Sequence, residues 1–548
     1  MQDTATGTYT FGYDNMNRLT SAGANYSFTS VGTLTVQYGY DLASNRTSMT
    51  DPQSVTTAYA YDTLNRLHTL TYNGQTPNFV FAYDDISRRT SLTRPNGVET
   101  TYGYDPVSQL KTVIHSLGTT ALDGATYTYD NAGNRLTRTD KRLGTTLTYG
   151  YDNIYQLKTA TQGTTTKESY TYDLVGNRLS SLNVSPYNYN SSNELTSTPS
   201  GSYTYDANGN TLSDPSGKSY TWDYENRLTQ VVLAGSGGTV NFKYDPFGRR
   251  VQKSGPLGTT NYLYDGMNLL EEVDNSGNVL AKYTQGEEFD EELAELRSGA
   301  TNYYESDGLG SISSVSNSLG ALANTYAYDS FGKLTASTGT LPNPFQYTGR
   351  ELDAETGLYF YRARYYDPIG GRFLSEDPAA FEAGENFYPY AGNNPVIFSD
   401  PFGLQSSVPP GCSPPFAAPC GPPAYGPPTD PTPPPPPTPA VPSWWPGPGS
   451  GTSSSSDSSS GAGSSSSPSP QPAPGGSRQC DQKNGKWHCT AKCHINNFSN
   501  LPNVPGFVTG EGWGNSAGDA QLAAEKNANT KVPRGTYKRH CSFKCDQR

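Results

Sequence analysis

The C-terminal tail, residues 480–548, holds the side chains best suited to metal, redox or nucleophilic chemistry, because five of the seven cysteines lie there. A Cys-x3-Cys spacing occurs twice in this tail, and three histidines neighbour the pairs. Three chemistries fit such a group: disulfide bonds in an oxidising space, a zinc site, or a thiolate nucleophile. The sequence leaves all three open for Cys480, Cys489, Cys493, Cys541, Cys545, His488, His494 and His540. Zinc in the tail is the one cofactor that it suggests, and we expect none for the rest of the chain.

A second chemical group consists of three Asp-Pro steps, at Asp367, Asp377 and Asp400. Asp-Pro commonly begins a turn, because the carboxylate bonds nearby backbone N–H groups and proline fixes φ. We interpret Asp367 as a turn residue of this kind. Two carboxylates held close together can also share a proton and act as an acid–base pair. The spacing of Asp377 and Asp400 in the chain does not by itself predict that they meet.

The elements that must position these residues come from a repeat. Phrases such as YAYDTLNRLH and YTYDNAGNRL recur with a period of about 21 residues, which is typical of a repeat architecture. The aspartates of successive repeats are Asp14, Asp41, Asp62, Asp84, Asp105, Asp130, Asp152 and Asp173. Tyr-x-Tyr alternates as a strand does, Asp starts a turn, and Gly or Asn follows where φ becomes positive. Each repeat therefore predicts a β-hairpin too small to bury its own face, so that hairpins stack into one long spiralling sheet.

The composition agrees with extended sheets and poorly with a compact helical enzyme. Only 33% of the residues are hydrophobic and mean hydropathy is −0.67, yet there are 41 tyrosines, which favour strands. No apolar run approaches the ~20 residues of a membrane span, and no secretory signal is visible at the N-terminus. Residues 476–548 hold 11 Lys/Arg and 5 Asp/Glu, a net charge of +6, so an acidic body carries a basic tail.

The repeats resemble the Rhs/YD-repeat family, which includes bacterial polymorphic toxins, toxin-complex C proteins and teneurins. Residues 302–334 are similar to the late repeats of that family, and residues 344–404, which end in DPFGL, closely resemble its Rhs-associated core module. The resemblance implies a mainly β fold in which hairpins spiral into a hollow shell around the chain's own C-terminal polypeptide. It divides the shell into repeats over 1–300 and late repeats with the core module over 301–404.

The same resemblance implies a one-shot aspartic protease. It assigns Asp377 and Asp400 as the catalytic pair, Arg364 as the basic residue that supports them, and the Leu404–Gln405 bond as the cleavage site. Because the substrate is tethered to the enzyme, its positioning costs little and a single slow turnover suffices. One carboxylate would act as a base on water and the other would polarise the carbonyl.

Composition predicts a disordered linker over 405–478. Its proline run favours stiff polyproline II and its Ser/Gly run is flexible. A passive tether is the simplest interpretation, and a ligand for a proline-binding partner is the alternative.

Residues 479–548 predict a small basic α+β domain. Residues 516–529 indicate an Ala-rich helix with Ser516 as its N-cap, and WHCTAKCHINNF and VPGFVTGEGWG predict strands before it. This stretch is similar to the end of a double-stranded-RNA-binding fold, although Ala517, Gly518 and Asp519 stand where that family has basic residues. A group of basic residues could contact nucleic acid, but a solvated charged surface is the commoner explanation of such a group: Lys531, Arg534, Lys538, Arg539 and Lys544.

Two functions from different classes fit these patterns. The first is a bacterial toxin shell, secreted or on the cell surface by a route without a visible signal peptide, that releases an effector after Leu404. Its partners would be its own C-terminal domain, an immunity protein, a secretion apparatus and nucleic acid, with no membrane span. The second is a non-enzymatic surface protein that binds or adheres through its tail, and an inactive displaced fragment is a third possibility.

Overall fold

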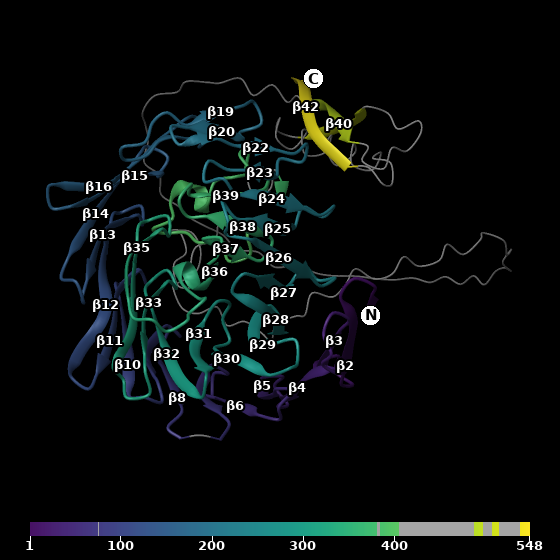
Figure 1. The fold of residues 1–548 in the computed structure, drawn as a ribbon. Helices are drawn as coiled ribbons and strands as arrows, with labels where there is room; N and C mark the ends of the chain where they lie inside the picture. The colour runs from purple at the N-terminus through teal and green to yellow at the C-terminus, as the bar shows by residue number, and fades with distance from the viewer. Residues whose placement is uncertain (75, 381–383, 405–486, 497–506, 515–536, 548) are drawn as a thin grey trace, which may run out of the picture. The chain divides into compact units, whose positions relative to one another are not determined.

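The computed structural model describes residues 1–548 except 75, 381–383, 405–486, 497–506, 515–536 and 548 (Figure 1). The chain divides into two units, Met1–Thr438 and Pro439–Arg548, which are described separately below. The predicted linker and the predicted helix over 516–529 lie outside the described residues.

The first unit is built almost wholly of strands, as the sequence predicts. The larger of its two main sheets has sixteen strands in chain order: β1 (Gln2–Asp3), β2 (Gly7–Tyr13), β3 (Leu19–Tyr26), β4 (Leu34–Tyr40), β5 (Arg46–Thr50), β6 (Thr56–Tyr61), β7 (Leu67–Tyr72), β8 (Phe79–Tyr83), β9 (Arg89–Thr93), β10 (Val98–Tyr104), β11 (Leu110–Leu117), β12 (Thr120–Tyr129), β13 (Arg135–Asp140), β14 (Thr146–Tyr151), β15 (Leu157–Gln162) and β16 (Thr165–Ser169).

The second main sheet has fourteen strands, again in chain order: β22 (Thr204–Tyr205), β23 (Thr211–Ser213), β24 (Ser219–Trp222), β25 (Leu228–Val232), β26 (Thr239–Tyr244), β27 (Arg250–Gly255), β28 (Gly258–Asp265), β29 (Asn268–Val273), β30 (Val279–Gln285), β31 (Glu292–Arg297), β32 (Ala300–Ser306), β33 (Ile312–Ser316), β34 (Leu322–Tyr328) and β35 (Leu334–Thr338).

Short elements complete this unit. They are the pair β17 (Thr171–Tyr172) and β18 (Arg178–Ser180); the three-stranded β19 (Asn188–Tyr189), β20 (Leu195–Thr198) and β21 (Gly201–Ser202); the four-stranded β36 (Glu351–Asp353), β37 (Leu358–Tyr361), β38 (Arg364–Asp367) and β39 (Arg372–Phe373); and the 3₁₀ turns η1 (Tyr347–Gly349) and η3 (Ala391–Asn393).

The turn between the strands of a repeat is made by the aspartate. In the fourth repeat, Oδ1 of Asp84 accepts the N–H groups of Ile86 at 3.1 Å and Arg88 at 2.9 Å, and Ser87 between them has φ +66°. The same bonds to the residues two and four positions on are made by Asp14, Asp62, Asp105, Asp130, Asp152, Asp173, Asp206, Asp223 and Asp245. The predicted turns with positive φ are therefore confirmed, but Gly or Asn does not always stand there, since Ser87, Ser108 and Tyr155 have positive φ in their repeats.

The tyrosine before each aspartate joins one repeat to the previous one. The hydroxyl of Tyr83 donates to the carbonyl of Leu67 at 2.9 Å, and that of Tyr104 donates to the carbonyl of Arg89 at 3.0 Å. The guanidinium of Arg66 lies 4.7 Å from the centre of the Tyr83 ring, within cation–π range. Neighbouring repeats are thus linked through side chains as well as through the strand ladder.

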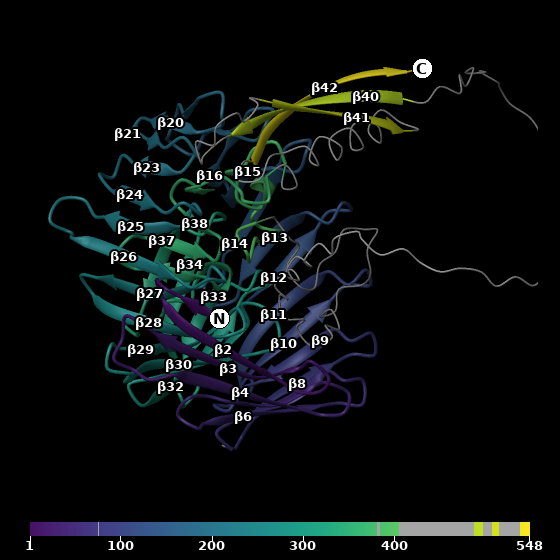
Figure 2. The same cartoon turned by 90° about the vertical axis from the view of Figure 1, so that its right-hand side faces the viewer.

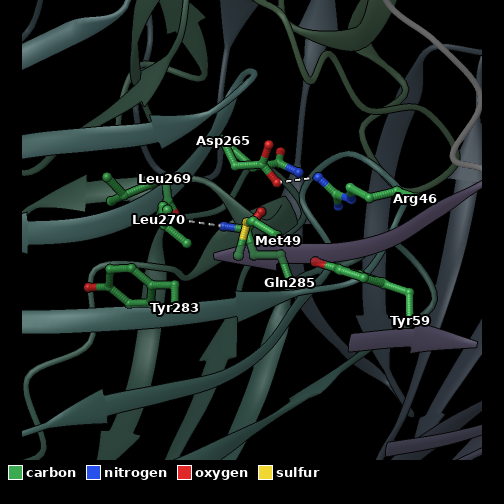
Figure 3. Close-up of a pocket in the computed structure, with 10 residues that line it drawn as sticks. Arg46, Met49, Tyr59, Asp265, Leu269, Leu270, Tyr283 and Gln285 are labelled. Carbon is green, nitrogen blue, oxygen red and sulfur yellow. Dashed lines mark hydrogen bonds and ion pairs between the residues drawn. The ribbon is translucent and has the colours of Figure 1, made fainter. Parts of the chain in front are cut away.

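Side chains of the two main sheets also meet across the first unit. Figure 2 shows β2–β12 and β25–β33 in the same body, and a single buried hydrophobic cluster combines residues from both, among them Tyr26, Phe81, Val251 and Leu263. The hydroxyl of Tyr26 donates to the carbonyl of Tyr262 at 2.7 Å. In Figure 3, Arg46 from β5 reaches Asp265 at the end of β28 with an N–O distance of 2.5 Å.

The second unit contains one described sheet, in the order β41 (Phe507–Gly514), β40 (Trp487–Asn496) and β42 (Tyr537–Gln547), with antiparallel neighbours. The two strands predicted in the tail correspond to β40 and β41. Over the described parts of both units, no helix is long and apolar enough to cross a membrane.

Candidate active site

The candidate site is built on the tight hairpin between β37 and β38. Aromatic packing fixes this hairpin, since Tyr359, Tyr361 and Tyr366 are fully buried in a cluster with Phe373 and Tyr390. The ring centres of Tyr366 and Tyr390 lie 4.6 Å apart. Packing of this density leaves the side chains at the hairpin turn little freedom.

Arg364, the first residue of β38, joins the two aspartates of the core module. Its Nη2 atom lies 2.7 Å from Oδ2 of Asp377 and 3.1 Å from Oδ2 of Asp400. Because both carboxylate oxygens contact the same nitrogen atom, the two carboxylates lie close to each other. The guanidinium also lies 3.6 Å from the centre of the Phe373 ring and donates through Nη1 to the carbonyl of Phe387 at 2.8 Å.

All three Asp-Pro steps form turns, as predicted for Asp367. Oδ1 of Asp367 accepts the N–H of Ile369 at 2.9 Å, and Oδ1 of Asp377 accepts that of Ala379 at 2.8 Å. Oδ1 of Asp400 accepts the N–H of Leu404 at 3.0 Å. Asp377 and Asp400 differ from Asp367 because only these two also contact Arg364.

Burial controls the charge of the site. Asp377 and Asp400 are 7% and 2% exposed. Burial raises the pKa of the Asp377 carboxyl from its usual 3.8 to about 6, while the Arg364 guanidinium and the Ala379 N–H oppose that rise. Two ionised carboxylates and one guanidinium leave a net negative charge in a buried place, and one proton on Asp377 removes it.

The DPFGL segment lies against the hairpin turn in register. Arg362 donates through Nη1 to the carbonyl of Pro401, the N–H of Ala363 donates to the carbonyl of Phe402 at 3.1 Å, and Nε of Arg364 donates to the carbonyl of Gly403. Residues 362–364 thus donate hydrogen bonds to the carbonyls of residues 401–403, one to each. These bonds hold the backbone in place up to the residue before Leu404.

A second charged cluster supports this segment from the loop between β30 and β31. Asp290 accepts hydrogen bonds from Arg350 at 2.5 Å and from Arg362 at 2.6 Å, and all three side chains are buried. In the same loop, the Phe289 ring packs edge-on against Phe402, with centres 5.0 Å apart. Sequence reasoning missed these residues. The sequence could have indicated a role for Arg362, because this arginine precedes Arg364 by only two positions. It could not have indicated Asp290, which lies in an irregular loop far from Arg350 in the chain.

The structure thus brings Asp377, Asp400 and Arg364 together next to Leu404, and their catalytic role remains a prediction. Gln405 lies outside the described residues, as do Cys480, Lys531 and Arg534. The other predicted tail residues lie on two neighbouring strands: His488, Cys489, Cys493 and His494 on β40, and Lys538, Arg539, His540, Cys541, Lys544 and Cys545 on β42. Lys544 is exposed.

Comparison with known proteins identifies the shell. The family described as teneurin YD-shell matches residues 142–396. The chain is 33% identical over 287 residues to the tRNA3(Ser)-specific nuclease WapA of Bacillus spizizenii, a match that covers 50% of this chain and 11% of that protein. It is 30% identical over 181 residues to the probable deoxyribonuclease RhsA of Dickeya dadantii, covering 30% and 12%. Residues 142–396 therefore match the YD-shell family, and the chain is similar to WapA and RhsA proteins.

A solved structure agrees with the Rhs/YD-repeat fold. The crystal structure of TcdB2-TccC3 superposes with a TM-score of 0.61 at 21% identity, and the match covers 73% of this chain and 24% of that chain. The repeats therefore form a β-shell of the Rhs/YD type. This chain spans about a tenth of the length of the two relatives named above.

Gly403 provides a test of how the DPFGL segment is held. It has φ +67°, and a Cβ there would lie 2.4 Å from the carbonyl oxygen of Tyr361. Gly357 is the matched control, because it has φ +72° and open space around it. We expect Gly403→Ala to speed amide hydrogen exchange over 400–404 at least about tenfold, and Gly357→Ala to leave it unchanged, since both carry the same backbone strain but only the first collides. Equal exchange in the two variants would contradict this packing.

Proposed function

We propose that this chain is a toxin-delivery shell that cuts its own backbone between Leu404 and Gln405 and so frees its C-terminal segment. The observation that carries the proposal is the position of Arg364, which binds both aspartates and the Gly403 carbonyl one residue before the cleavage site. The buried contacts of the DPFGL segment support it, because they would hold the substrate in place before any reaction.

The chemistry assigns different roles to the two aspartates. Asp400 accepts hydrogen bonds from Arg364 and from the Leu404 N–H, which favour its ionised form. It acts as the base that takes a proton from water as the water oxygen attacks the Leu404 carbonyl carbon. Asp377, with its raised pKa, supplies a proton to the carbonyl oxygen. As the C–N bond breaks, Asp400 gives the proton that it took from water to the Gln405 nitrogen, and Asp377 takes a proton back from a hydroxyl of the tetrahedral intermediate. The products are a carboxyl group at Leu404 and an amino group at Gln405.

Arg364 serves as the electrostatic partner of this reaction. Its positive charge offsets the second carboxylate while both aspartates are ionised, and it faces the backbone where negative charge develops. Nε of Arg364 donates to the carbonyl of Gly403. The guanidinium that holds the acid and the base therefore also aligns the peptide next to the proposed cleavage site.

The cleavage proposal predicts the fate of three matched variants. Asp377→Asn and Asp400→Asn each remove a carboxylate while keeping its shape, and we expect the full 59.1 kDa chain to remain uncut in both. Asp367→Asn alters the one remaining Asp-Pro step, and among the described residues Asp367 makes no ion pair with Arg364. This variant should be cut as fully as the wild type. Intact mass under denaturing conditions measures the outcome.

Cleavage after Leu404 in both site variants would refute the dyad. An uncut wild type would instead favour the alternatives, a YD-repeat adhesion protein or an inactive displaced fragment, because neither needs a cut at this bond. No contact in the described residues favours either alternative over the proposal.

The pH dependence tests the acid role of Asp377. Its pKa of about 6 means that the protonated form predominates below pH 6 and falls tenfold per unit above it. We therefore expect the first-order rate of self-cleavage to decline as pH rises through about 6. The rate is measured by refolding the denatured, uncut chain at a series of pH values and following the fragments over time. A rate that rises across this range would contradict the assignment.

The released segment is proposed to be a cationic effector directed at nucleic acid. Two relatives are named as a tRNA nuclease and a probable deoxyribonuclease, and residues 476–548 carry a net charge of +6 that suits phosphate contact. The proposal includes a bacterial origin, export from the producing cell, an immunity protein and a secretion apparatus as partners.

The effector role has a direct biochemical test. Cleaved full-length protein should degrade or modify either bulk tRNA or duplex DNA, and the uncut Asp400→Asn chain should be much less active because its tail remains attached to the shell. Electrophoresis and nucleoside mass spectrometry of both substrates measure the activity. Absence of any change to either substrate would refute nucleic acid as the target.

A further inference from the structure

The ladder between β40 and β42 places four tail cysteines in two facing pairs. Cys489 lies opposite Cys545, and Cys493 lies opposite Cys541. The two strands are antiparallel neighbours, so each pair is in direct cross-strand register. The Cys-x3-Cys spacing on each strand is what allows both pairs to match at once.

We propose that these pairs form two cross-strand disulfides, Cys489–Cys545 and Cys493–Cys541, and that Cys480 takes no part in them. Residues directly opposite in an antiparallel ladder have Cα atoms about 4.5 or 5.5 Å apart, depending on the type of pair. Disulfides need about 4.4–6.8 Å, so either type of pair is suitable. This inference does not depend on the self-cleavage proposal.

The register also selects among the possible pairings. Four cysteines allow three connectivities. Cys489 and Cys493 are four positions apart on one strand, which separates them by about 13 Å, and the crossed pairing of Cys489 with Cys541 spans a similar distance. Only the facing pairs meet the geometric requirement of a disulfide.

The same spacing argues against a zinc ion bound by all four cysteines. The two pairs are separated by about 13 Å along the strands, whereas two thiolates on one zinc can be at most about 4.6 Å apart. His494 lies at the register shift between Cys493 and Ile495.

Each bridge forms by thiol–disulfide exchange with an external disulfide, either a small molecule or an oxidoreductase. One cysteine thiolate attacks the external disulfide and releases one thiol, and the facing thiolate then displaces the second thiol from the mixed disulfide. Two cysteine thiols are oxidised and one external disulfide is reduced to two thiols. The bridges would therefore be absent in a reducing cytosol and form after export to an oxidising space.

Trypsin separates every relevant cysteine, so the pairing is directly measurable on the full chain. Cleavage after Lys and Arg places the cysteines in different peptides: Cys480 in 479–483, Cys489 in 487–492, Cys493 in 493–526, Cys541 in 540–544 and Cys545 in 545–548. After incubation with excess oxidised glutathione, blocking of free thiols and digestion, we expect 487–492 joined to 545–548 and 493–526 joined to 540–544.

Two variants make the test specific. Cys545→Ser should abolish only the link to 487–492, and Cys480→Ser should leave both links intact. Crossed links, links to 479–483, or free thiols at all four positions after oxidation would overturn the proposal. Native mass spectrometry of the reduced chain tests the rival hypothesis of a zinc site. A retained zinc ion that protects these thiols from oxidised glutathione would also overturn the disulfide proposal.

Discussion

The bond between a turn aspartate and the backbone two and four positions later is the constraint on which the shell depends. It ends one strand, sets the direction of the next, and leaves the residue between in a left-handed conformation, as at Asp84 and Ser87. The tyrosine before it then reaches back to a carbonyl of the previous repeat, as Tyr83 reaches Leu67. The adjacent Tyr and Asp of each repeat therefore determine both the turn and the link to the previous repeat. Because these bonds are polar, a chain with few hydrophobic residues can still build large sheets.

The core module contains the same kind of turn in a buried setting. Asp377 and Asp400 make Asx-type turns like those of the repeats, yet both are buried and both contact one guanidinium. The side chain of Asp84 in a repeat turn is partly exposed, whereas burial of Asp377 raises the pKa of its carboxyl. The raised pKa of Asp377 therefore follows from burial of a kind of turn that the repeats already supply.

Local features could be predicted from the sequence, and long-range ones could not. Period and turn chemistry predicted the hairpins, and the tail strands followed from their residues. The resemblance of the core module brought Asp377, Asp400 and Arg364 into one prediction. Nothing local indicated that Asp290 would meet Arg350 and Arg362, or that Tyr26 would bond Tyr262, because these contacts form only when the curved sheets close on each other. The register of β40 with β42 was equally hidden, since the two strands are not consecutive in the chain and no short turn fixes their alignment.

Residues 1–404 and the tail also differ in what can hold them together. Residues 1–404 contain no cysteine, and their stability comes from a ladder repeated over many strands with tyrosine and arginine side chains bridging neighbours. The tail has few residues with which to build a core, and domains of this size commonly need cross-links or a metal. Its cysteines are concentrated where β40 and β42 face each other. Cross-linking would therefore give the tail a stability that depends on its surroundings, low in a reducing cytosol and high in an oxidising space, while residues 1–404 would be unaffected by that change.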